Sequence, residues 1–185
     1  KVAAKAQVEA YPFDLGRVRL LPSQFERAMK INQKYLLDLD ADRMLWPYHE
    51  RAGLPTKGER YGGWELKDIV GQTNGHYITA LSLMYASTGD KRFKERVDYI
   101  VSEIAKAQQE HGDGYTGPVR TEVWKNIFSG DLKAHKWGVG GGYVPWYVMH
   151  KTFAGLIDEP YEQHDLPPAV EELESAADLE TRTQE

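Results

Sequence analysis

The 185-residue sequence contains no cysteine. This excludes a disulfide framework, a zinc site with cysteine ligands and a thiol nucleophile supplied by these residues. No apolar run approaches the roughly 18 residues that a membrane-spanning helix needs, so we expect no membrane partner. The sequence also lacks clusters of lysine and arginine. Their absence argues against a nucleic-acid partner, whose phosphates call for a basic surface.

The charges divide unevenly along the chain. Residues 1–158 carry 22 Lys and Arg against 19 Asp and Glu, whereas residues 159–185 carry one arginine against nine acids. We therefore predict a globular domain over 1–158 and an acidic tail over 159–185. The tail is expected to be either disordered or a short amphipathic helix over about 168–180. Residues 1–10 lack the apolar segment of a signal peptide, which fits a cytoplasmic protein or an exported one already processed.

Hydrophobic spacing predicts helices in four places. They are expected over about 24–40, 75–87, 91–109 and 145–157. Their starts are indicated by Ser23 with Glu26 (a capping box), Asn74, Asp90 and Pro145. The first and third of these helices have one apolar stripe, whereas the second and fourth are apolar nearly all round.

This alternation predicts the architecture. In a double ring of helices the outer members touch solvent and the inner members touch neighbours on both sides, whereas an ordinary bundle gives every helix a polar face. We therefore predict an all-α fold, an α/α toroid or part of one. The segments 41–73 and 110–144 are long and rich in glycine and aromatic residues, which is typical of functional loops.

Candidate site residues gather where these loops meet the two apolar helices. His76 would lie in the first turn of the second helix, where the helix dipole favours a neutral imidazole that can bond sugar hydroxyls. Trp146 and His150 are four residues apart and share a helix face, which suits a sugar ring with an apolar face and a polar rim. Structural roles for such a histidine and tryptophan are more common than sugar binding. The histidine is then a hydrogen-bonded structural residue, and the tryptophan is packed in the core.

Catalysis does not follow from the residues alone. Glycoside hydrolysis normally needs two carboxylates about 5 to 9.5 Å apart. The available acids are Glu65, Asp68, Asp113 and Glu122. Nothing in the sequence shows that two of them converge. The glycines at 140–142 lack the strand and helix of a phosphate loop, and His111 and His135 are not at metal-ligand spacing.

Five ordered sequence blocks resemble a known family. They are F-x-x-A-x-x-x-N-x-x-Y-L-L-x-L-D (25–40), A-G-L-P (52–55), Y-G-G-W-E (61–65), N-G-H-Y-I-T-A-L-S-L-M-Y-A-S-T-G-D (74–90) and V-P-W-Y-V-M-H-K-T-F-A-G-L-I-D (144–158). They resemble the N-terminal part of the catalytic domain of beta-L-arabinofuranosidases, glycoside hydrolase family 127 and its close relatives, over about residues 11–158. The resemblance implies an (α/α)6 barrel, of which this chain holds only the first part. It also implies a carbohydrate partner, L-arabinofuranosyl or related plant-type sugars, and an extracellular or periplasmic location after signal removal.

The resemblance also implies a set of substrate-binding residues. They are His76, His150, Trp64, Glu65, Trp146 and Gln72. The family commonly reads G-H-x-x-G-H at 71–76, so Gln72 replaces the first histidine and alters one sugar contact. The family's nucleophilic cysteine, its zinc-binding cysteines and glutamate, and its acid/base glutamate lie in later segments without counterparts here. We therefore expect no cofactor in this chain and assign no catalytic residue.

Three interpretations remain open. The chain is a glycoside hydrolase domain, a sugar-binding module without chemistry, or an inactive barrel fragment. A fragment would self-associate into a homo-oligomer through the exposed faces of its inner helices. Converging carboxylates would favour the first, sugar affinity without turnover the second, and a concentration-dependent mass the third.

Overall fold

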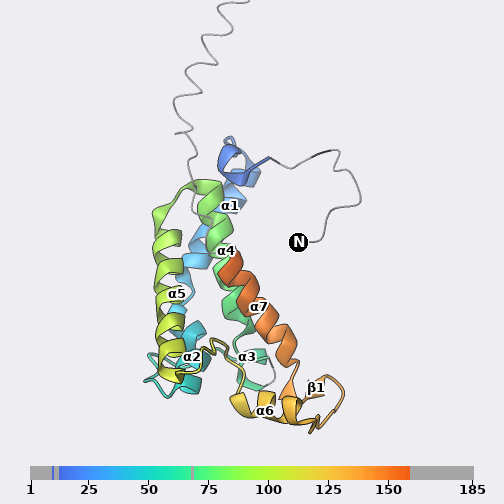
Figure 1. The fold of residues 1–185 in the computed structure, drawn as a ribbon. Coiled ribbons are helices and arrows are strands. Elements are labelled where there is room, and N and C mark those ends of the chain that lie inside the picture. Colours follow the sequence, from blue (N-terminus) through green and yellow to red (C-terminus); the bar gives the residue numbers. More distant parts are fainter. Residues whose placement is uncertain (1–9, 11–12, 68, 159–185) are drawn as a thin grey trace, which may run out of the picture.

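The computed structural model describes residue 10, residues 13–67 and residues 69–158 (Figure 1). This part of the chain is predominantly helical with one two-stranded antiparallel hairpin, so the predicted helical class is confirmed. Asp68 and the predicted acidic tail, with its expected helix over 168–180, lie outside the described residues. None of the described helices is both long and apolar enough to cross a bilayer.

The elements follow one another along the chain as follows. First come the 3-10 helix η1 (Leu15–Arg17), α1 (Gln24–Asp38), α2 (Ala41–Ala52), α3 (Trp64–Lys67), α4 (Gln72–Thr88) and α5 (Lys91–His111). They are followed by α6 (Thr121–Ser129), β1 (Gly138–Val139), β2 (Gly142–Tyr143) and α7 (Pro145–Asp158).

Three of the predicted helix starts are confirmed because their signals are local. Ser23 accepts a hydrogen bond from the Glu26 N–H at 3.3 Å at the start of α1. Asp90 accepts one from the Arg92 N–H at 3.1 Å at the start of α5. Helix α7 begins at Pro145, where the missing N–H of proline costs nothing.

Helix α4 is the centre of the fold. Gly89, in the left-handed conformation (φ 71°), ends α4 and lets α5 return along it. Helix α7 packs along α4, so α4 lies between α5 and α7 (Figure 1). Ile78 and Leu81 of α4 have no exposed surface. The prediction of a helix buried on most sides therefore holds for α4.

The close packing of α4 on α7 depends on two glycines. A Cβ atom added at Gly75 would lie 2.0 Å from the carbonyl oxygen of Lys151, and one added at Gly155 would lie 2.6 Å from that of Gly75. Only glycine permits so close an approach of the two backbones. This crossing places residues that are distant in sequence, near 76 and near 150, beside one another.

Both segments predicted as loops contain helices, which corrects the sequence analysis. Helix α2 lies in the first, where Asp40 caps its start and Gly53 (φ 72°) ends it, with Pro47 accommodated inside. Its Leu45 and Tyr48 belong to the core. Helix α6 and the β1–β2 hairpin lie in the second segment.

The predicted start of α4 is also wrong. Asn74 does not cap the helix, which begins at Gln72 after a left-handed Gly71 (φ 90°), and the Asn74 side chain is fully buried. His76 therefore lies in the second turn rather than the first. An argument from the helix dipole does not apply at this position, because that effect fades after the first turn.

Candidate functional site

The N-terminal half of α7 presents two of the predicted site residues on one face. Val144 precedes the helix, and its carbonyl accepts the N–H groups of Tyr147 and Val148 at 3.0 and 3.2 Å. Trp146 and His150 follow one turn apart, and both are exposed. The predicted pairing of an indole and an imidazole on one helix face is therefore present.

These two side chains line a groove between α6 and α7 of about 710 Å³. Most of its surface is apolar. Its other lining residues are Asp113, Tyr115, Thr121, Trp124, Lys125, Phe128, Met149, Phe153, Ala154 and Ile157. A mainly apolar groove with a few polar groups at its edge is typical of a small-ligand site. We call it the α6–α7 groove.

Trp124 of α6 also lines the groove and is in direct contact with Trp146. The two ring centroids are 4.7 Å apart and the rings meet edge to face. The Trp124 Nε1–H donates to the Tyr115 hydroxyl at 2.9 Å, and that hydroxyl donates to the Val119 carbonyl at 2.7 Å. Burial raises the pKa of Tyr115 to about 12, so its hydroxyl keeps its proton at neutral pH. The chain of bonds fixes the Trp124 ring in place.

Sequence reasoning missed this aromatic wall. Trp124 and Phe128 are four residues apart on α6, and their rings are stacked with centroids 6.5 Å apart. The signal was available, because a tryptophan and a phenylalanine at this spacing share one face of a helix. The prediction of a loop over 110–144 leaves this helical spacing unused.

His76 lies beside the groove without lining it. Its side chain is exposed on α4, near His150 and Lys151 of α7. Partial desolvation lowers the pKa of His76, and the positive charges of Lys151 and His150 lower it further. The imidazole is therefore neutral at pH 7 and can both donate and accept a hydrogen bond. His76 and His150 lie close enough to interact electrostatically, and their role as sugar ligands stays a prediction.

Glu65 forms hydrogen bonds that hold the start of α4. Its carboxylate accepts the N–H of Gly71 at 2.6 Å and the N–H of Thr73 at 3.0 Å, and it also bonds the Thr73 hydroxyl. These groups lie at the start of α4, where backbone N–H groups otherwise lack partners. Glu65 therefore caps α4 from α3.

Trp64 and Gln72 are also placed away from the groove. Trp64 lies on α3 with 70% of its surface exposed. Gln72 is the first residue of α4 and is half-buried. Neither lines the α6–α7 groove, whose lining includes His150 and Trp146 but none of the other four predicted residues.

The candidate carboxylates do not form a pair in the described part of the chain. Asp113 lines the groove, Glu65 caps α4, and Glu122 is exposed in the first turn of α6. The arrangement provides a binding surface, with one carboxylate at its edge.

The described residues do not fit the zinc site that the resemblance implies for the family. The chain has no cysteine, and among the described residues no three His, Asp or Glu side chains are grouped as metal ligands.

Comparison with known proteins agrees with the sequence motifs. A search of curated proteins found no match to this chain. A family model described as "Beta-L-arabinofuranosidase, GH127 catalytic domain" matches residues 17–178, which is most of the chain and extends past the last motif at 158. The chain therefore belongs to the family of the GH127 beta-L-arabinofuranosidase catalytic domain.

Proposed function

We propose that this chain binds an L-arabinofuranosyl or related plant-type sugar in the α6–α7 groove. The observation that carries the proposal is the position of Trp146 and His150, one turn apart on the groove wall, with Trp124 packed edge to face against Trp146. An indole ring packs against the apolar C–H face of a sugar, and an imidazole bonds the hydroxyls at its rim. His76, neutral and adjacent to His150, would supply a second set of hydrogen bonds.

We further propose that these 185 residues bind the sugar without hydrolysing it. The resemblance assigns the family's nucleophile to a cysteine, and the sequence has none. Of the three candidate carboxylates that the structure describes, only Asp113 lines the groove, whereas hydrolysis needs two. The helices α1, α2, α4, α5 and α7 would form the first part of an (α/α)6 barrel. An extracellular or periplasmic location remains a prediction.

Thermal unfolding with sugars tests binding by the folded chain. A ligand that binds only the folded state stabilises it by RT ln(1 + [L]/Kd), so 100 Kd of ligand adds about 2.7 kcal/mol. We expect L-arabinose to raise the midpoint of the wild-type chain and to have no effect on Trp146→Ala. Trp137→Ala is the matched control, because Trp137 is 69% exposed and does not line the groove.

A turnover assay with an aryl arabinofuranoside separates binding from catalysis. Binding without release of the aryl group supports a sugar-binding module. Release of the aryl group at a rate that depends on Asp113 would show that the groove is catalytic, and would overturn the second proposal only. A midpoint unmoved by every sugar would overturn the first.

The exposed apolar surface of this region, which includes three residues of the α6–α7 groove, favours a second function. Large apolar side chains are exposed on α4, α6 and α7, including Leu83, Phe128, Phe153 and Ile157, the last with 73% of its surface exposed. Soluble monomers rarely expose contiguous apolar patches of this kind. We propose homo-oligomer formation through these faces as the alternative. Light scattering over a range of concentrations tests it, because a monomeric mass throughout would exclude it.

A further inference from the structure

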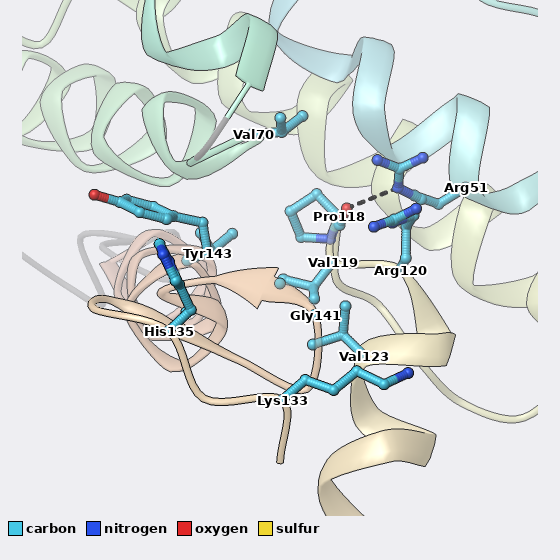
Figure 2. Close-up of a pocket in the computed structure, with 13 residues that line it drawn as sticks. Arg51, Val70, Pro118, Val119, Arg120, Val123, Lys133, His135, Gly141 and Tyr143 are labelled. Atoms are coloured by element: carbon cyan, nitrogen blue, oxygen red, sulfur yellow. Dashed lines mark hydrogen bonds between the residues drawn. The ribbon is translucent and has the colours of Figure 1, made fainter. Parts of the chain in front are cut away.

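A second pocket lies at the other side of α6, and the proposed sugar groove does not include it. Its volume is about 330 Å³. The end of α2, the segment 118–120, the start of α6 and the β1–β2 hairpin form its walls (Figure 2). Pockets for small molecules run from about 300 to 1,000 Å³, so this one suits a ligand of monosaccharide size.

Close backbone contacts build this pocket. A Cβ atom added at Gly142 would lie 2.8 Å from the Val123 side chain, and one added at Gly71 would lie 2.4 Å from Pro118. The Arg51 Nε–H donates to the Pro118 carbonyl at 3.1 Å, which ties α2 to the far wall (Figure 2). The pocket is thus held by packed elements from four parts of the chain.

The charged side chains that line the pocket are all basic. They are Arg51, Arg120 and Lys133, and no carboxylate is among the lining residues, which also include His135. Figure 2 shows Arg51 and Arg120 together on one side, with His135 and Tyr143 on the other. Burial lowers the pKa of Arg51, and the charges of Arg120 and Arg60 lower it further, against the opposing effect of Glu50.

Carboxylates that do not line the pocket pair with two of these basic side chains. Glu50 bonds Arg51, and Asp131 lies 3.1 Å from the Lys133 ammonium group. The Arg120 side chain has no hydrogen-bond or ion-pair partner among the residues that the structure describes, although the backbone carbonyl of Arg120 accepts the Val123 N–H at 3.0 Å. Its guanidinium group therefore has its full set of donors available for a ligand.

The start of α6 adds to the positive potential. Arg120 is the N-cap residue of the helix and supplies no side-chain cap. Both Arg120 and Val123 line the pocket, so the first turn of α6 faces it. The Val123 N–H is bonded to the Arg120 carbonyl, so what this end of α6 contributes is the positive end of the helix dipole, which favours an anion nearby.

We infer that this pocket binds the oxyanion of a small ligand, a carboxylate or a phosphate, with Arg120 as its main contact and Arg51 and Lys133 beside it. Guanidinium groups match the two-oxygen geometry of both anions. The inference is independent of sugar binding in the α6–α7 groove, because it concerns different residues and a different ligand group.

Titration of the full chain followed by amide NMR tests the inference, with galacturonate, inorganic phosphate and neutral galactose as probes. Arg120→Gln should weaken binding of the anion by about tenfold, the usual cost of a charge-assisted hydrogen bond at a partly exposed site. Lys133→Gln is the second variant. Arg27→Gln is the matched control, because Arg27 is an exposed arginine on α1, away from the pocket. Thermal melts establish that each variant is folded.

Saturable changes in amide chemical shifts with galacturonate alone identify the ligand group as a sugar carboxylate. Changes with phosphate alone identify it as a phosphate group. Shifts with both support a general oxyanion site. The inference is overturned if neither anion binds, if galactose binds as well as galacturonate, or if Arg120→Gln and Arg27→Gln have the same affinity as the wild-type chain.

Discussion

Replacing Glu103 by glutamine tests a buried carboxylate that joins α2 to α5. Glu103 is 3% exposed, and its carboxylate lies 2.8 Å from the Lys57 ammonium group and 3.0 Å from Nε2 of the buried His49. It also pairs with Lys106. Burial raises the pKa of Glu103, but the hydrogen bonds from Lys106 and Lys57 outweigh it and hold the pKa at about 2.

The size of the effect follows from that pKa. The ordinary value is 4.5, and a difference of about 2.5 units corresponds to about 3 kcal/mol of folding stability above pH 5. Because the folded-state pKa of Glu103 is the lower one, this stability is lost as the pH falls from about 4.5 toward 2. About 1.4 kcal/mol of it should be gone by pH 3.5.

Urea unfolding at pH 7 and at pH 3.5 measures both quantities. We expect Glu103→Gln to lower the free energy of unfolding by about 2 to 3 kcal/mol at pH 7, with a deficit about 1.4 kcal/mol smaller at pH 3.5. Glu95→Gln is the matched control. Glu95 is exposed on the same helix, so its replacement should stay within about 0.5 kcal/mol. A Glu103→Gln deficit below 0.5 kcal/mol, or one that does not change with pH, would refute the reasoning.

Two further substitutions test how the site is positioned. Gly75→Ala places a methyl group 2.0 Å from the Lys151 carbonyl, so we expect the free energy of unfolding to fall by at least about 3 kcal/mol, or the chain not to fold. Gly62→Ala is the control, because its methyl group meets open space and should leave the thermal midpoint unchanged. Glu65→Ala removes the cap that bonds Thr73, so we expect a loss of about 1 to 2 kcal/mol. Sugar affinity of the folded Glu65→Ala chain should be unchanged, and a tenfold weaker affinity would show that Glu65 contacts the ligand.

The helices that sequence reasoning found are those with local signals. A side-chain cap at Ser23 or Asp90 depends on a residue two or three positions away, and a spacing rule detects it. The start of α4 depends on Glu65, which lies six residues before Gly71 on another helix. No pattern within α4 itself reveals such a tertiary cap.

Helix α2 was missed for a related reason. The length of segment 41–73 and its glycine and aromatic residues favoured a functional loop, although Asp40 and Gly53 at the ends of α2 are ordinary start and stop signals. Burial of Leu45 and Tyr48 against the core outweighs the cost of Pro47 within the helix. The candidate site was found in part, because Trp146 and His150 share a helix, whereas Trp124 reaches them only through the tertiary packing of α6.

Ligand-observed NMR with methyl β-L-arabinofuranoside tests the central claim most directly. We predict saturation transfer from the wild-type chain and from Trp137→Ala, competed by excess L-arabinose, and a loss of transfer for Trp146→Ala and His150→Ala that remain folded. Equal transfer from all four chains, or none from the wild type at millimolar sugar, would contradict the assignment of the α6–α7 groove as a sugar site.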